Sequence, residues 1–303
     1  MIKSIGDILI TFQSSGIDLP SRSSAPWQEI ASFDDARVLI TKPDVHLCGF
    51  PMTTHQDKSW QIWALGEFYG DKDPDLSQAL EKSRDLNGHF LVIAFEKQVK
   101  SWHILTDRFG TVHAYLADDG KRAALGTFSP AVADAASVKT LDWKAIAGFF
   151  TFGFFLDDRT YWDDLRIIKP ATHIILDQHG KVISENKTWQ WQYNPDSRLS
   201  YKDALVEFAK LFETILLDQV DDKTVALPIS GGLDSRSTLV PLTDLGWVSS
   251  KNLVPFSYGY GENSVEIAIA NKLAQKRHLD LKTWQIHPYL FDQVEHLLAV
   301  LEG

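Results

Sequence analysis

The sequence predicts two successive domains: an α+β domain of sheets covered by helices, then an α/β domain with a parallel sheet. Its 303 residues are enough for two domains. Short apolar or alternating segments dominate the first two thirds, whereas strand and helix patterns alternate afterwards. The turn-forming stretch Asn-Pro-Asp-Ser at 194–197 separates the two patterns. We therefore predict domains at 1–195 and 196–303.

The first domain is expected to consist mainly of strands. Two helices interrupt them. Leu76, Ala79, Leu80 and Leu86 suit one helix face within 73–86, and Asp142 is placed to cap a second helix over 141–153. The expected strands are apolar or alternating segments bounded by turn residues, at 37–41, 45–50, 60–65, 90–95, 102–105, 112–116 and 173–177.

The second domain is expected to begin with a long amphipathic helix over 200–220. Ser200 and Asp203 have the spacing of a helix-capping pair at its start. Strands and helices then alternate, which is typical of a parallel sheet with crossover helices. The expected strands are 224–229, 253–260 and 281–286, and the expected helices are 233–242, 264–277 and 289–303.

Composition excludes several classes of function. The net charge of −10 disfavours broad nucleic-acid binding, although a local site for a phosphorylated ligand remains compatible with it. No apolar run is long enough to span a bilayer, so no membrane partner is expected. A single cysteine, Cys48, permits no internal disulfide, and a cytoplasmic location is expected.

The segment SGGLDS at 230–235 has the residues of a phosphate-binding turn. It follows an apolar strand and precedes a helix, and ligands of parallel sheets bind at the carboxyl ends of strands. Gly231 and Gly232 leave backbone N–H groups uncovered, while Ser230 and Ser235 add hydroxyl donors. Asp234 would repel a polyphosphate unless Mg²⁺ lay between them. The alternative is a strand–turn–helix corner in which Ser230 only caps the helix.

The segment is neither a Walker A loop nor G-x-G-x-x-G. It resembles the PP-loop of ATP pyrophosphatases, and the stretch 254–284 is similar to the second strand and helix of the asparagine synthetase family. This resemblance implies an adenine nucleotide α-hydrolase-like, Rossmann-like fold, with ATP and Mg²⁺ as cofactors and Asp234 as catalytic residue and metal ligand. It also implies ATP and pyrophosphate binding by Ser230, Gly231, Gly232, Leu233, Asp234 and Ser235, and adenine binding by Leu227, Phe256, Tyr258 and Gly259.

The N-terminal part resembles the class II glutamine amidotransferase domain of the same family. The similar segments are LGEFYG at 65–70, LNGHFLVIAFE at 86–96, TDRFGTVHAYL at 106–116 and the stretch 149–177. Each is weak alone, and their order ahead of the PP-loop-like segment makes the resemblance specific. It implies an amidotransferase-like αββα sandwich.

The chain departs from the family at the glutaminase site. Ile2 stands where the family has its nucleophilic cysteine, and Leu65 replaces the oxyanion-hole asparagine. The family's R-H-R-G-P-D segment is absent, and only Asp75 lies near the position of the aspartate that holds the glutamine amino group. Cys48 lies in an apolar run and is expected in the core. The domain is therefore expected not to hydrolyse glutamine, and to act as a support or docking surface.

The resemblance implies an ATP-dependent amide-forming ligase. A small-molecule or peptide carboxylate would be adenylated with release of pyrophosphate, and ammonia or an amine would then displace AMP. Related chemistry of the β-lactam synthetase or lasso-peptide cyclase type is an alternative. So is a noncatalytic module, because the family's domain continues to an S-G-x-G-x-D-E loop that is absent before Gly303. The sequence is then expected to be a fragment of a longer protein or to be completed by a partner chain.

Other candidates are less specific. Arg236 could reach a phosphate or an acidic substrate, or pair with a carboxylate of the N-terminal domain. Glu266 is either a solvent-facing helix acid or a ribose or substrate contact. The acidic pairs at 157–158 and 163–164 are expected in a solvated loop rather than around a cation. No two histidines have metal-ligand spacing, so structural or surface roles are expected.

Overall fold

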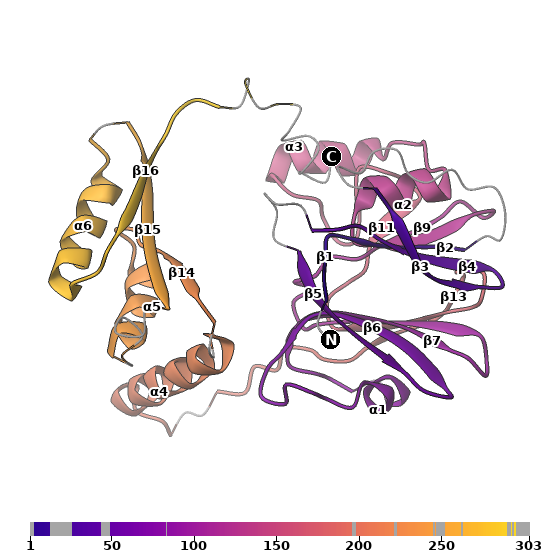
Figure 1. The fold of residues 1–303 in the computed structure, drawn as a ribbon, viewed down its shortest axis with the longest axis horizontal. Coiled ribbons are helices and arrows are strands. Elements are labelled where there is room, and N and C mark those ends of the chain that lie inside the picture. The colour runs from indigo at the N-terminus through magenta and orange to yellow at the C-terminus, as the bar shows by residue number, and fades with distance from the viewer. Residues whose placement is uncertain are drawn as a thin grey trace. The chain divides into compact units, whose positions relative to one another are not determined.

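The chain divides into two compact units in a computed structural model, and the second unit spans Tyr193–Gln293 (Figure 1). No described helix has the length and apolar character needed to cross a membrane. The residues that the structure describes are 3–12, 26–43, 49–82, 84–195, 198–220, 223–244, 246, 252–261, 263–289, 292 and 294.

The first unit contains a seven-stranded sheet in which all neighbouring strands are antiparallel. Its central strands are almost wholly buried, which suits their content of Leu, Ile, Val, Phe and Trp. In spatial order the strands are β1 (Lys3–Ile5), β5 (Phe50–Gln56), β6 (Trp60–Phe68), β7 (Gly88–Glu96), β8 (Ser101–Thr106), β12 (Thr172–Leu176) and β13 (Val182–Lys187).

A second antiparallel sheet of six strands belongs to the same unit. Its spatial order shows that β9 and β10 form a hairpin, and that β10 then pairs with the N-terminal strand β2. The strands are β11 (Leu165–Ile167), β9 (Tyr115–Asp118), β10 (Ala123–Gly126), β2 (Ile8–Thr11), β4 (Ala36–Ile40) and β3 (Gln28–Phe33).

The first unit has four layers, which are two sheets and the helices on their outer faces, because alternate side chains of each strand pack on opposite faces of its sheet. Ile10, Val38, Trp63 and Ile104 point from both sheets into one shared core. On the outer face of the six-stranded sheet, apolar side chains pack against α2 (Ser129–Ala136). On the outer face of the seven-stranded sheet they pack against α1 (Leu76–Glu81). The expected α+β fold of sheets covered by helices is confirmed, and the structure adds that both sheets are antiparallel.

Of the helices predicted for this unit, one is confirmed at its start and one is shorter than predicted, and a third helix was not predicted. Asp142 caps α3 (Trp143–Phe152), accepting hydrogen bonds from the backbone N–H groups of Lys144 (3.0 Å) and Ala145 (2.9 Å). The expected helix over 73–86 is shorter, because α1 ends at Glu81; Leu86 still packs against the same core. The sequence analysis missed α2, whose alanine-rich turns carry a weak period. Of the expected strand 45–50, residues 45–48 lie outside the described part of the chain.

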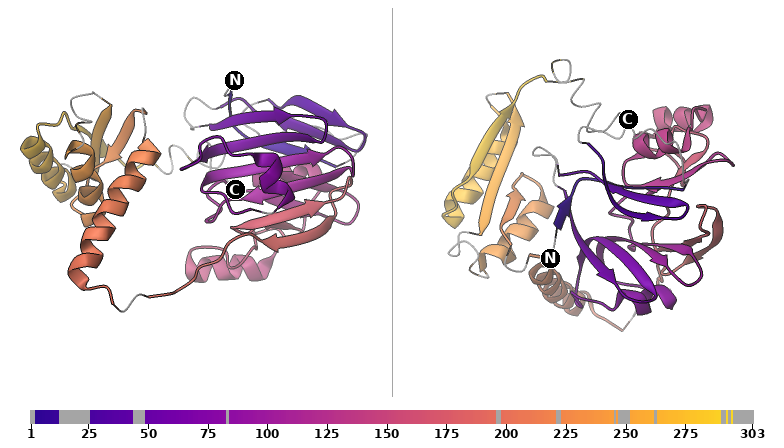
Figure 2. Two further views of the ribbon diagram at one scale, coloured as in Figure 1. Left: turned by 90° about the horizontal axis from the view of Figure 1, so that it is seen from below. Right: turned by 45° about the vertical axis from the view of Figure 1, so that its right-hand side comes forward.

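The second unit is a three-stranded parallel sheet with helices (Figures 1 and 2). Ser200 caps α4, as predicted, by accepting a hydrogen bond from the backbone N–H of Asp203 (3.2 Å). Most of the expected helix at 289–303 lies outside the described residues. The elements are α4 (Tyr201–Val220), β14 (Val225–Pro228), α5 (Leu233–Asp244), β15 (Leu253–Tyr260), α6 (Val265–Arg277) and β16 (Lys282–Ile286), with the spatial order β14-β15-β16.

One face of this parallel sheet is covered by helices. Leu227 of β14, Leu239 and Leu242 of α5 and Ala270 of α6 share a buried core, to which α4 contributes through its last turn, at Val220. The strand residues with the other parity point away from this core, and they include Phe256, Tyr258 and Tyr260 of β15. The carboxyl ends of β14 and β15 therefore lead directly into the loops before α5 and α6.

Candidate functional site

The strongest candidate site is the loop that joins β14 to α5. Pairing continues one residue past β14, because the backbone N–H of Ile229 donates to the carbonyl oxygen of Phe256 at 2.7 Å. Ile229 is also buried, so it anchors the loop in the core. The next three residues turn the chain, and α5 begins at Leu233. Ser230–Ser235 thus lies at the carboxyl end of a parallel strand, as predicted.

Two serine hydroxyls hold the turn together. The Oγ atoms of Ser230 and Ser235 lie 3.1 Å apart, and the backbone N–H of Ser230 donates to Ser235 Oγ at 3.1 Å. The backbone N–H of Gly232 donates to Ser230 Oγ, also at 3.1 Å. The bond from Gly232 to Ser230 is a serine turn within the loop and not a helix cap, because α5 begins only at Leu233; the loop is thus preorganised by its own side chains.

Gly231 brings the loop against the start of α6. Its backbone N–H donates to Oε2 of Glu266, which lies in the first turn of that helix. A Cβ atom on Gly231 would lie 2.9 Å from Ile269 Cδ1 and 3.2 Å from Glu266 Oε2. A side chain at this position would therefore require the ends of the Ile269 and Glu266 side chains to shift. Glu266 is exposed, as expected for a solvent-facing helix acid, and its carboxylate contacts the loop before α5.

Asp234 lies in the first turn of α5 with an exposed side chain. Leu233 beside it is 72% exposed, which is unusual for leucine and leaves the helix start open to solvent. Arg236 turns back, and its Nε donates to the carbonyl oxygen of Gly232 at 3.0 Å. This bond secures the loop, and the expected contact of Arg236 with a phosphate or an acidic substrate stays a prediction.

The residues predicted to contact adenine lie on both faces of the sheet. Leu227 is 6% exposed and belongs to the helix-covered core, whereas Tyr258 is 49% exposed on the opposite face. Phe256 shares the face of Tyr258 and lies against Trp284, with ring centroids 5.6 Å apart. Gly259 approaches the cap of α6, where an added Cβ would lie 2.1 Å from Ser264 Oγ.

Two residues named for the expected glutaminase site have structural roles in the first unit. Leu65 is fully buried and belongs to the core shared by the two sheets. Asp75 caps α1, accepting from the backbone N–H of Gln78 at 2.9 Å, and this role engages its carboxylate. Ile2 and Cys48 lie outside the described residues, so the expected core position of Cys48 stays a prediction.

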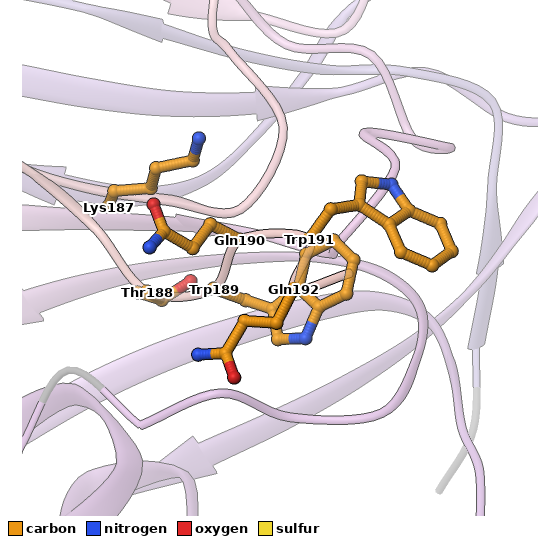
Figure 3. A pocket seen from close by; sticks show the side chains of 6 residues that line it. All are labelled: Lys187, Thr188, Trp189, Gln190, Trp191 and Gln192. Atoms are coloured by element: carbon orange, nitrogen blue, oxygen red, sulfur yellow. The ribbon is translucent and has the colours of Figure 1, made fainter. Parts of the chain in front are cut away.

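A second candidate is an aromatic hollow that was not predicted from the sequence and lies just before the predicted linker at 194–197. Residues 187–192 line a hollow of about 760 Å³ (Figure 3), beside another of about 520 Å³ that includes Arg108. The rings of Trp189 and Trp191 lie 5.1 Å apart, and the guanidinium of Arg108 lies 5.5 Å from the Trp189 ring centroid. In the sequence, the repeated Trp-Gln pairs at 189–192 were the pattern from which this hollow could have been predicted.

The remaining polar candidates have structural partners. His103 and His173 are far apart in sequence, but Nδ1 of the first lies 3.1 Å from Nε2 of the second inside the first unit. Burial, and secondarily the neighbouring His173, lowers the pKa of His103 to about 4. Asp157 and Asp158 pair with Lys169, at 3.0 and 3.6 Å. Within the described residues, no group of three or more His, Cys, Asp or Glu side chains could hold a metal ion.

No known protein family and no curated protein matches this chain. Among solved structures, an allosteric regulatory enzyme of purine biosynthesis is similar, with 8% identity, a TM-score of 0.36, and 92% of this chain and 80% of that one covered. A glutamine phosphoribosylpyrophosphate amidotransferase from B. subtilis, complexed with ADP and GMP, has 9% identity, a TM-score of 0.29, and coverages of 80% and 58%. At these TM-scores the matches assign neither a family nor a function.

Proposed function

We propose that the chain is an ATP-dependent, amide-forming ligase of the asparagine synthetase type, with its nucleotide site at Ser230–Ser235. The observation that carries the proposal is the loop itself. It places glycine backbone groups, two hydroxyls and the exposed Asp234 together at the carboxyl end of a parallel strand. Asp234 also suits the positive end of α5, so the proposal rests on the combination of these groups at one strand end rather than on the aspartate alone.

The proposed reaction begins with a carboxylate substrate. One of its oxygens attacks the α phosphorus of ATP, the bond to the bridging oxygen breaks, and pyrophosphate leaves. The lone pair of ammonia or an amine then attacks the acyl carbon, AMP departs with the electrons of the carbon–oxygen bond, and the nitrogen loses a proton to solvent. Backbone donors near the phosphates would stabilise the charge that develops on oxygen.

Mg²⁺ is the cation that this chemistry implies, and Asp234 suits it. Mg²⁺ prefers oxygen ligands and is often held by one or two carboxylates together with substrate phosphates. The side chain of Asp234 is exposed, so its oxygens can be reached from solvent. When bound, Mg²⁺ would neutralise charge between Asp234 and the phosphates.

The nitrogen is proposed to come from free ammonia or from a substrate amine. This follows from the residues at the N-terminal unit, where Leu65 and Asp75 serve packing and helix capping. The first unit would then support the second rather than supply it with ammonia from glutamine.

A substitution at Asp234 tests the proposed site. Binding of a fluorescent ATP analogue in the presence of Mg²⁺ would be compared between the unaltered chain, Asp234→Asn and the control Glu207→Gln. The control removes one exposed acid from α4 of the same unit. We expect at least a tenfold loss of affinity for Asp234→Asn alone, equivalent to about 1.4 kcal/mol. Equal affinities for all three proteins would contradict the proposed role of Asp234.

A further inference from the structure

We propose that Glu266 is a competitive gate on the nucleotide site: its carboxylate occupies the Gly231 backbone donor and must leave before a triphosphate can use that donor. This inference rests on the proposed function and adds a residue that sets nucleotide affinity. It is carried by the contact between two elements that lie 35 residues apart in sequence.

The contact places a negative group on the donor that the loop would offer to phosphate. The backbone N–H of Gly231 donates to Glu266 Oε2 rather than to another atom of its own loop. By contrast, the N–H of Gly232 is engaged by Ser230 Oγ, within the turn. A carboxylate and a phosphate oxygen are both anionic acceptors, so they compete for the same N–H.

Glu266 is placed so that it can leave. Its side chain is exposed, so water can solvate the carboxylate once the contact breaks. Its backbone lies in the first turn of α6, whose positive end continues to favour a negative side chain there. The N-terminus of α6 does not depend on Glu266, because Ser264 caps it by accepting from the backbone N–H of Ile267 at 3.4 Å.

The gate also makes binding depend on the cation. Asp234 lies at the start of α5, within the loop segment, and Glu266 at the start of α6 contacts the same loop through Gly231. A triphosphate arriving without Mg²⁺ would meet the repulsion of both groups. Displacing Glu266 removes one of them from the donor, and the cation screens the other.

The experiment is calorimetric titration of the full 303-residue chain with a non-hydrolysable ATP analogue and Mg²⁺. Glu266→Gln removes the charge and keeps the size, whereas Glu266→Asp keeps the charge on a shorter side chain. Glu213→Gln, an exposed acid of α4, is the matched control for the change in net charge. Circular dichroism of each variant establishes that it is folded.

We expect Glu266→Gln to bind the analogue about fivefold to tenfold more tightly, because the exposed hydrogen bond from Gly231 to a charged carboxylate no longer has to be broken. Glu266→Asp should show a smaller gain, and Glu213→Gln should not change the affinity. The Gly231 amide resonance should move in Glu266→Gln without nucleotide, which reports the broken contact directly.

Two results would overturn the proposal in different ways. If the unaltered chain binds the analogue, and Glu266→Gln binds it equally well or more weakly, Glu266 is not a competitor and only the gate fails. If the folded unaltered chain and every variant fail to bind, the nucleotide site itself is refuted and the gate falls with it.

Discussion

The buried histidine pair makes the first unit sensitive to acid. His103 on β8 is 6% exposed and its ring lies near that of Trp60, with centroids 4.9 Å apart. Its Nε2 lies 3.3 Å from a carboxylate oxygen of Glu96, and 3.1 Å from Ser101 Oγ. Burial nevertheless outweighs this carboxylate, and the pKa of His103 is lowered to about 4. His103 is therefore neutral at neutral pH, and its contact with Glu96 is not an ion pair there.

The sign of the pH dependence follows from this lowered pKa. The unfolded chain binds a proton at His103 below pH 6.5, but the folded chain does not until about pH 4. The folded state is therefore progressively destabilised as the pH falls through this interval. At 1.36 kcal/mol per pKa unit, the loss reaches at most about 3 kcal/mol. The pKa of His173 is also lowered by burial, which acts in the same direction.

Two measurements test this pH dependence. Titration of the histidine ring signals by NMR should show His103 still neutral at pH 5. Urea denaturation at pH 7.5 and pH 5 should show a smaller loss of stability in His103→Gln, which keeps a polar side chain without the titration. The reasoning would be refuted by a His103 signal that titrates near pH 6.5, or by an identical loss in both proteins.

Three further predictions concern the first unit. Trp102 is 1% exposed and lies between aromatic rings in the shared core, so Trp102→Ala should lower the free energy of unfolding by about 3–5 kcal/mol in urea denaturation. Val99 is 65% exposed, so the control Val99→Ala should change this free energy by less than about 0.5 kcal/mol. Equal costs would contradict this packing. Asp107 accepts hydrogen bonds from three backbone N–H groups, at 2.8 to 3.1 Å. Asp107→Ala should therefore destabilise the folded first unit by about 2–4 kcal/mol, and the isosteric Asp107→Asn by less. Hydrogen exchange at the three amides would check this. With Leu65 buried in the core, the chain should release no ammonia from glutamine in a coupled assay, and turnover above the blank would show that this interpretation is wrong.

Local patterns predicted much of the fold. The strand over 253–260 matches β15 residue for residue, because its alternation of buried and outward-facing positions is regular and its ends carry turn residues. Asp142 and Ser200 were found as helix caps because capping is a local interaction of neighbouring residues. Helix α2 was missed, since six of its eight residues are buried and leave no polar face to give a period.

The site was only partly predictable for a related reason. The composition of residues 230–235 indicated a turn with exposed donors, and the structure places these residues at a strand end. The contact from Glu266 depends on how α6 packs against Gly231, so no local pattern reports it. The same holds for His103 and His173, which antiparallel pairing of β8 with β12 brings together across 70 residues.

The most direct test of the central claim is calorimetric titration of the unaltered chain with a non-hydrolysable ATP analogue, with and without Mg²⁺. Saturable binding at one site that requires Mg²⁺ is the predicted result, because Asp234 opposes the phosphates unless a cation lies between them. The absence of binding by the folded chain in the presence of Mg²⁺ would contradict the assignment of a nucleotide site to Ser230–Ser235.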